Sequence, residues 1–271
     1  MKEKAFFKKV VPWLKGEKSI NFLSGIASMI LFVGFWAAAV EWTPVGRFLS
    51  PPNEVIANFI RSFTVPIGRY TLTDHILISM QRVMIGYGIG SVLGLVLGLV
   101  MGVSKIGRAI ISPIFEIIRP IPIIAWIPLA IMWFGIGEMP KVFITFLATY
   151  ANVALNTYAG VTSVDPTLLG ASKMLGANKL QTFLWVIYPA AVPNIFAGLQ
   201  IALSTSWMGV LAAEMVRSNE GVGWIIIMGQ ERGSTVQILT GMLSIGIVGL
   251  LLSVIMREIE WRLCRWNIVG R

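Results

Sequence analysis

The chain has 271 residues, of which 56% are hydrophobic and only 13% are charged. A soluble domain carries about 25% charged residues, so a chain with a mean hydropathy of +0.77 cannot cover its apolar surface in water. The composition excludes a soluble domain and a disordered chain. The net charge of +9 is explained better by basic loops beside a membrane than by binding to nucleic acid. One histidine, His75, and one cysteine, Cys264, support neither a metal cluster nor a disulfide within the chain.

Six apolar stretches are long enough to cross a bilayer, which takes about 20 apolar residues. They cover residues 22–40, 76–103, 110–135, 142–161, 193–213 and 236–256. We predict an all-α membrane protein with about six transmembrane helices, whose transmembrane domain covers residues 22–256. Residues 1–21 form a basic arm that could fold as an amphipathic helix, and residues 257–271 form a basic tail.

Most lysines and arginines outside the spans lie in the arm, in the turn after the second span, in the loop 164–192 and in the tail. Loops rich in Lys and Arg stay on the cytoplasmic side. We therefore predict that both termini and the loop 164–192 are cytoplasmic.

Two short segments fall on the opposite side. Asn53 is a good N-cap, and the apolar residues that follow recur at helical spacing, which predicts a short amphipathic helix on the outer face. Residues 221–225 are apolar but too short to span a membrane. They either cap the outer mouth of a pathway or anchor the chain at the interface.

The second span carries a glycine every four residues, at Gly86, Gly90, Gly94, Gly98 and Gly102. Glycines at this spacing let a neighbouring helix approach closely. Because a helical turn holds 3.6 residues, the glycine strip winds around the helix and can reach more than one neighbour. Tight packing is the favoured interpretation, and a gating hinge is the alternative.

The third span contains Pro120, Pro122 and Pro128. Proline inside a helix removes a hydrogen bond and clashes with the preceding turn, and irregular backbone at membrane depth must be buried or line a cavity. We predict a broken helix that lines a pathway. Glu116 and Arg119 are three residues apart and are expected to neutralise each other.

The loop 164–192 predicts two short helices. Asp165 can cap the first helix, Pro166 suits its first position and Gly176 suits the position after its end. Asn178 can start the second with Gln181 completing a capping box, and Pro189 is expected to close it. A plain linker does not need such definition, so we interpret the loop as a docking element for a soluble partner, with a simple folded loop as the alternative.

The same loop resembles the EAA loop of ABC-importer permeases. Ala171, Gly176 and Pro189 match that pattern, whereas Gly170 and Tyr188 depart from it. The resemblance implies that the coupling contact with the ATPase is made by eight residues: Gly170, Ala171, Ser172, Lys173, Met174, Leu175, Gly176 and Ala177.

The motifs at residues 50–52, 119–122, 125–129, 133–137 and 221–224 are similar to the nitrate/taurine/alkanesulfonate/bicarbonate branch of these permeases. The resemblance implies an importer in the bacterial plasma membrane, with a second copy of this chain, two cytosolic ATP-binding-cassette subunits and an external solute-binding protein. The chain has no Gly-x4-Gly-Lys-[Ser/Thr] motif, the loop that binds nucleotide phosphates. We therefore expect that it is not an enzyme and carries no cofactor, and that ATP and Mg bind to the partner ATPase. The solute is expected to be a small anion, with organic sulfonates such as taurine favoured over nitrate or bicarbonate.

Eight polar or aromatic side chains in or near the spans are candidates for the translocation pathway: Arg82, Arg119, Trp126, Gln200, Ser204, Thr205, Trp207 and Glu214. Glu214 is expected at the outer edge of the membrane, where it either extends to the interface or pairs with Arg217 three residues on. The rival functions are a secondary transporter driven by an ion gradient, an intramembrane enzyme and a membrane scaffold. A secondary transporter usually shows internal repeats and a carboxylate at mid-membrane, and neither is evident.

Overall fold

The computed structural model describes residues 17–264 of the chain, with side chains from residue 23 onward. Helices make up the described part, apart from loops and a lone bridge between Ile67 and Tyr70. In chain order they are α2 (Glu17–Trp42), η1 (Pro44–Arg47), α3 (Pro52–Arg61), α4 (Leu72–Val103), α5 (Lys105–Ile118), η2 (Ile123–Trp126), α6 (Ile127–Phe134), α7 (Glu138–Thr162), α8 (Pro166–Met174), α9 (Lys179–Thr182), η3 (Phe183–Ile187), α10 (Tyr188–Val216), α11 (Val222–Glu231) and α12 (Thr235–Leu263).

Five helical stretches are long and apolar enough to cross a membrane, namely Leu23–Trp42, Leu72–Val103, Glu138–Thr162, Lys179–Val216 and Thr235–Leu263. The predicted third span is broken, as the prolines indicated: Lys105–Ile118 and Ile123–Phe134 meet at an angle of 89°. The all-helical fold with five to six spans is therefore confirmed. The predicted amphipathic helix of the arm lies outside the described residues.

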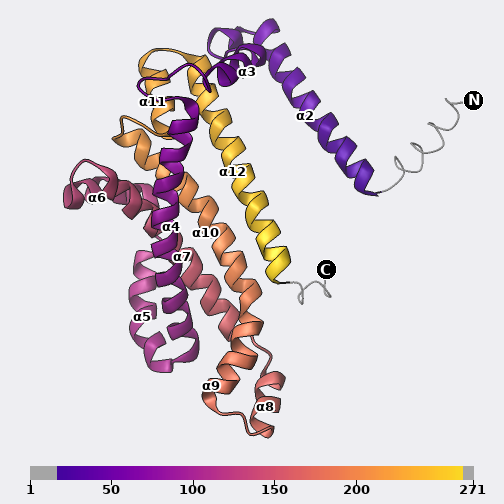
Figure 1. Ribbon diagram of the computed structural model, residues 1–271, viewed down its shortest axis with the longest axis vertical. Coiled ribbons are helices and arrows are strands. Elements are labelled where there is room, and N and C mark those ends of the chain that lie inside the picture. The colour runs from indigo at the N-terminus through magenta and orange to yellow at the C-terminus, as the bar shows by residue number, and fades with distance from the viewer. Residues whose placement is uncertain (1–16, 265–271) are drawn as a thin grey trace, which may run out of the picture.

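Figure 1 shows an elongated bundle with α3 and α11 at one end and α8 and α9 at the other. We refer to these as the α3/α11 end and the α8/α9 end. Helices α4, α7 and α10 form the centre, with α11 and α12 packed against α10, and α5 against α4. Helix α2 stands apart from the bundle and packs mainly against η1 and α3.

The glycine strip of α4 packs against α7 alone. A Cβ added to Gly86, Gly90, Gly94, Gly98 or Gly102 would meet the helix surface formed by Thr145, Thr149, Val153, Thr157 and Val161. The expectation of more than one neighbour is therefore wrong. The facing positions on α7 also recur every four residues, so both strips drift in the same sense and the helices stay in contact by winding around each other.

Three local expectations need correction. Helix α3 starts at Pro52 with Pro51 as its N-cap, so Asn53 lies inside the helix. Residues 222–231 form a buried helix, α11, and not a surface anchor, because Val222 and Ile225 are fully buried against the bundle. Pro189 does not end the helix that begins at Lys179, because the π-helical turn η3 leads directly into α10, where the proline occupies one of the first two positions.

The α4–α7 contact yields a prediction. Gly90→Ala should destabilise the protein by about 1–3 kcal/mol, the usual cost of overpacking, because the new Cβ would lie 2.5 Å from Thr149 Cβ and 2.9 Å from the Phe146 carbonyl. Gly88→Ala on the same helix is the matched control, since nothing lies within 4 Å of its Cβ. Thermal unfolding in detergent measures both variants, and equal melting temperatures would contradict the packing role of the strip.

Candidate functional site

The loop between α7 and α10 forms the compact element that the sequence predicts. Asp165 caps α8 and accepts a hydrogen bond of 2.7 Å from the Thr167 amide, which lowers the pKa of the Asp165 carboxyl and keeps the cap charged at neutral pH. Gly176 ends the helix with a φ of +78°, a conformation that favours glycine. Asn178 and Gln181 then form a reciprocal capping box at α9.

The tip of this element is apolar and exposed. The side chains of Met174 and Leu175 are 92% and 87% exposed, and Leu180 and Trp185 beside them are also exposed. Ser172 is buried and its hydroxyl donates to the Leu169 carbonyl at 2.9 Å, so it holds the shape of the tip. The other predicted coupling residues lie at the surface or close to it, namely Gly170, Ala171, Lys173, Gly176 and Ala177.

The break in the third span lies beside a cleft of about 110 Å³ that Arg119, Trp126 and Asn152 help to line. Arg119 and Glu116 are both exposed, and no ion pair joins them among the residues that the structure describes. The expected neutralising pair is therefore absent there. Arg119 is the C-cap of α5 and keeps helical dihedral angles, so the missing pair results from the placement of the two side chains and not from a break between them.

Arg82 is the buried centre of an ion network near the α3/α11 end. Its side chain is 3% exposed. The guanidinium donates to Glu214 at 2.7 Å and to the carboxylate and carbonyl of Glu220 at 3.1 and 3.2 Å. It also makes a two-point contact with Glu138, and Lys141 donates to Glu138 at 2.8 Å. Three carboxylates and two cations from α4, α7, α10 and the loop before α11 thus form one network.

Glu214 is also bound by the start of α11. The Gly223 amide donates to its carboxylate at 2.9 Å and the Ser79 hydroxyl at 2.8 Å. Gly221 has a φ of +105°, and a Cβ there would collide with the Glu214 carboxylate. Glycine is therefore required where this loop passes the network.

His75 completes the support of this loop. Its Nδ1 accepts from the Gly221 amide at 3.0 Å, its Nε2 lies 3.0 Å from the Ile67 carbonyl, and its ring stacks on Trp224. The histidine is fully buried and every ring nitrogen has a partner. The interpretation of His75 as a structural residue agrees with these contacts.

The expected pair of Glu214 with Arg217 is not formed. Glu214 lies two residues before the end of α10, where it is fully buried and pairs with Arg82. Glu138 and Glu220 were not among the candidate residues, although each is a partner of Arg82. They come from a helix start and a loop far along the chain, so spacing gives no sign of the pairing. The unmatched Arg82 inside a span was the available signal, since a buried charge needs a partner.

The remaining pathway candidates lie on α10. Trp207 is 3% exposed, donates to the Ile245 carbonyl at 3.2 Å and belongs to the packed core. Thr205 shares hydrogen bonds with Asn152 and the Ala148 carbonyl. Ser204 is exposed and Gln200 is half-buried. Trp207 therefore packs within this chain, whereas Ser204 is open to what lies beside it.

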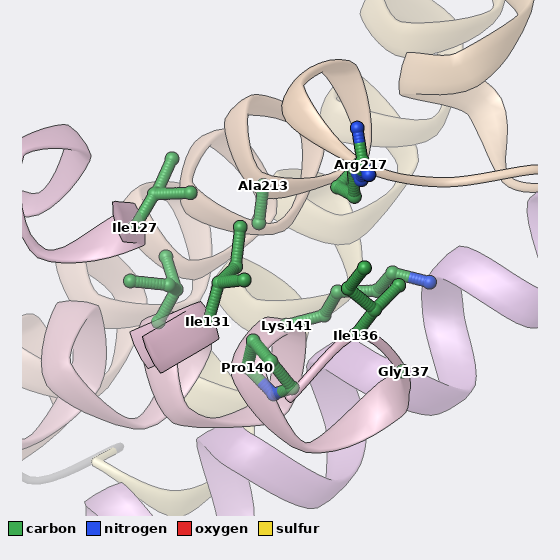
Figure 2. A pocket seen from close by; sticks show the side chains of 9 residues that line it. Ile127, Ile131, Ile136, Gly137, Pro140, Lys141, Ala213 and Arg217 are labelled. Atoms are coloured by element: carbon green, nitrogen blue, oxygen red, sulfur yellow. The ribbon is translucent and has the colours of Figure 1, made fainter. Parts of the chain in front are cut away.

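Figure 2 shows how α6 is fixed near the ion network. Ile127 and Ile131 of α6 face Ala213 of α10, and Ile136 and Pro140 continue this apolar contact toward Lys141. The space between them is only about 10 Å³, so the contact is closely packed. The second half of the broken span is thus held against α7 and α10.

Comparison with known proteins gives consistent matches along most of the chain. Residues 90–259 match the family described as "Binding-protein-dependent transport system inner membrane component". The chain is 34% identical to the taurine transport system permease protein TauC of Escherichia coli (strain K12), over 92% of this chain and 91% of that protein. It is 33% identical to the putative aliphatic sulfonates transport permease protein SsuC of the same organism, over 91% and 94% of the two chains.

More distant matches agree. The nitrate import permease protein NrtB of Leptolyngbya laminosa is 33% identical over 69% of this chain and 67% of that protein. An inward-facing structure of the MetNI methionine ABC transporter superposes with a TM-score of 0.61 at 22% identity, over 70% of this chain and 94% of that chain. This last similarity shows the fold.

The ion network yields a prediction about stability. Glu214→Gln should destabilise the protein by about 1–3 kcal/mol, because the amide leaves a buried donor without an acceptor, while Glu138 and Glu220 still neutralise Arg82. Glu258→Gln is the control, because its pair with Arg262 is exposed and such pairs contribute about 0–1 kcal/mol. Thermal unfolding of both variants tests this. A Glu214→Gln protein of unchanged stability that no longer transports would instead place Glu214 in the pathway.

Proposed function

Because the chain belongs to the family of binding-protein-dependent transport system inner membrane components, we propose that it is the membrane-spanning permease subunit of an ATP-driven importer for small anions. Its relatives include permeases named for taurine, aliphatic sulfonates and nitrate. Organic sulfonates are the favoured solutes, since the taurine and sulfonate permeases match more than nine-tenths of the chain. The importer works in the inner membrane by alternating access.

The exposed apolar tip of α8 carries the coupling proposal. A side chain such as Met174, 92% exposed, contributes to stability only when a partner covers it. A groove on a cytosolic ATPase fits this role, with the helix capped at both ends so that it moves as a rigid unit. The α8/α9 end then faces the cytoplasm, and residues 170–177 transmit the motion of the ATPase.

ATP and Mg belong to that partner in this proposal. The sequence holds no phosphate-binding Gly-x4-Gly-Lys-[Ser/Thr] loop, so this chain supplies no nucleotide site of that kind. Two ATPase subunits, two copies of the permease and an external solute-binding protein make up the expected importer. The homodimer is the simpler assembly, because a two-fold symmetric pair needs one kind of chain.

Arg119 is the proposed cation of the pathway. Helix α5 has 14 residues and is about 21 Å long. If it starts at the membrane surface, Arg119 at its end lies within the hydrocarbon layer, which is about 30 Å thick. Arg82 is already neutralised by three carboxylates, whereas Arg119 forms none of the ion pairs found among residues 17–264. A charge at that depth requires water or an anion beside it, and a passing sulfonate supplies the anion.

The coupling proposal is tested at Gly176. Gly176→Val forces a β-branched residue to a φ of +78°, where L side chains are strained by about 1–2 kcal/mol, and should lose most ATP-dependent uptake. Gly233→Val is the matched control, because Gly233 has a φ of +64° in equally open space at the other end of the bundle. Mild-detergent purification with mass spectrometry should recover an ATPase with wild type and the control but not with Gly176→Val. Recovery of the chain alone, with uptake driven by an ion gradient, would support a secondary transporter instead.

The pathway proposal is tested at Arg119. Arg119→Ala should lower the rate of taurine uptake by the assembled importer at least ~10-fold, the equivalent of about 1.4 kcal/mol, whereas Arg119→Lys should retain part of it. Lys105→Ala is the control, because this exposed lysine lies on the same helix, α5, at its other end. Normal uptake by Arg119→Ala would exclude the residue from the pathway.

A further inference from the structure

A second polar cavity lies at the α3/α11 end, away from the coupling tip and the broken span. It has a volume of about 160 Å³ and lies between the end of α3, the turn at residues 62–67 and the start of α12. Its lining consists of Asn58, Arg61, Ser62, Val65, Pro66, Ile67, Arg232 and Gln237. The lining thus includes two arginines and no carboxylate.

The hydrogen-bond donors of this cavity are unequally used. The Asn58 amide already donates to Thr240 at 2.9 Å, and the Ser62 hydroxyl to the Asn58 carbonyl at 2.7 Å. The guanidinium groups of Arg61 and Arg232 take part in none of the ion pairs or hydrogen bonds found within the described part of the chain. The Gln237 Nε2 atom is buried and has no acceptor. That atom is closed off from the cavity, so the free donors that the cavity offers are the guanidinium groups of Arg61 and Arg232. A guanidinium group only donates, so the cavity favours a ligand that accepts hydrogen bonds.

Nearby charges leave the cavity positive. Glu231, next to Arg232 in the chain, lines a different cavity at this end, one of about 780 Å³ beside Glu138 and Glu220. Glu54 is two helical turns from Arg61 on α3. The positive end of the α12 helix dipole also lies here, since that helix starts at Thr235 with Ser234 as its N-cap. The chemistry of the site therefore fits an anion with several oxygen acceptors.

The surroundings identify the source of that anion. Ile56, Ile60 and Phe63, on or next to α3, are 47%, 63% and 43% exposed, and α12 is a candidate membrane span that begins at the cavity. Exposed apolar side chains beside two arginines are typical of a membrane interface, where the apolar groups enter the acyl chains and the cations meet the headgroups. A soluble acidic protein would leave the apolar side chains uncovered.

We propose that this cavity binds the headgroup phosphate of an anionic phospholipid, with Arg61 and Arg232 as the donors. Phosphate accepts several hydrogen bonds, and arginine binds it through two of them at once. The headgroup of a zwitterionic lipid carries a cationic group as well as the phosphate. Because that group is repelled by the two arginines, such a lipid binds less tightly. The inference is independent of the transported solute, because none of these residues belongs to the proposed pathway.

The test is native mass spectrometry of the full chain in detergent, titrated with phosphatidylglycerol or with phosphatidylcholine of the same acyl chains. Wild type should bind phosphatidylglycerol at least ~10-fold more tightly than phosphatidylcholine. The double variant Arg61→Gln/Arg232→Gln should lose that preference. Arg47→Gln/Arg69→Gln removes two exposed arginines at the same end that do not line the cavity, so this control should keep the preference.

Three results would overturn the proposal. The first is that wild type and the Arg61→Gln/Arg232→Gln variant show the same preference for phosphatidylglycerol over phosphatidylcholine. The second is displacement of the lipid by inorganic phosphate at equal concentration, which would make the ligand a soluble phosphate. The third is unchanged lipid binding in the double variant together with weaker docking of the external solute-binding protein, which would assign the cavity to that protein. Melting temperatures of the delipidated variants, expected to match wild type, show that a lost preference does not reflect misfolding.

Discussion

The arrangement of the bundle depends on the neutralisation of one buried positive charge. Arg82 lies inside α4, where an unpaired guanidinium would be very costly, and the fold brings Glu138, Glu214 and Glu220 to it from three other segments. Any displacement of α7, α10 or the loop before α11 would separate one of these pairs. The requirement to keep Arg82 neutral therefore ties these elements to α4 near the α3/α11 end, and Gly221 gives the loop the close approach that this needs.

A rigid centre determines where motion can occur. The glycine strip fastens α4 to α7 along their whole contact, so these two helices act as one unit with the end of α10. Both halves of the third span are packed on this centre, α5 against α4 and α6 against α7. The element that remains separable is the pair α8 and α9, which projects from the bundle (Figure 1). Alternating access in the proposed importer then consists of whole permease subunits rocking as the tip of α8 is displaced, with little change inside each bundle.

Local chemistry explains which features could be predicted from the sequence. The α8/α9 element was predictable because its determinants are near neighbours in the chain: Asp165 caps the next turn, and Gly176 supplies the left-handed residue after it. The break at Pro120 was predictable for the same reason. The partners of Arg82 were not, because Glu138 and Glu220 lie 56 and 138 residues away along the chain, and only the packing of α4 against α7 and α10 brings them together.

As the proposed permease subunit, this chain moves a small anion only as part of an ATP-driven assembly. The most direct measurement is taurine uptake into sealed vesicles that contain the purified permease and its co-purifying ATPase, with the binding protein on one side and ATP on the other. The account predicts uptake that requires all three components and that persists when ionophores collapse the ion gradients. Uptake by the permease alone, driven by an imposed ion gradient and indifferent to ATP, would contradict it.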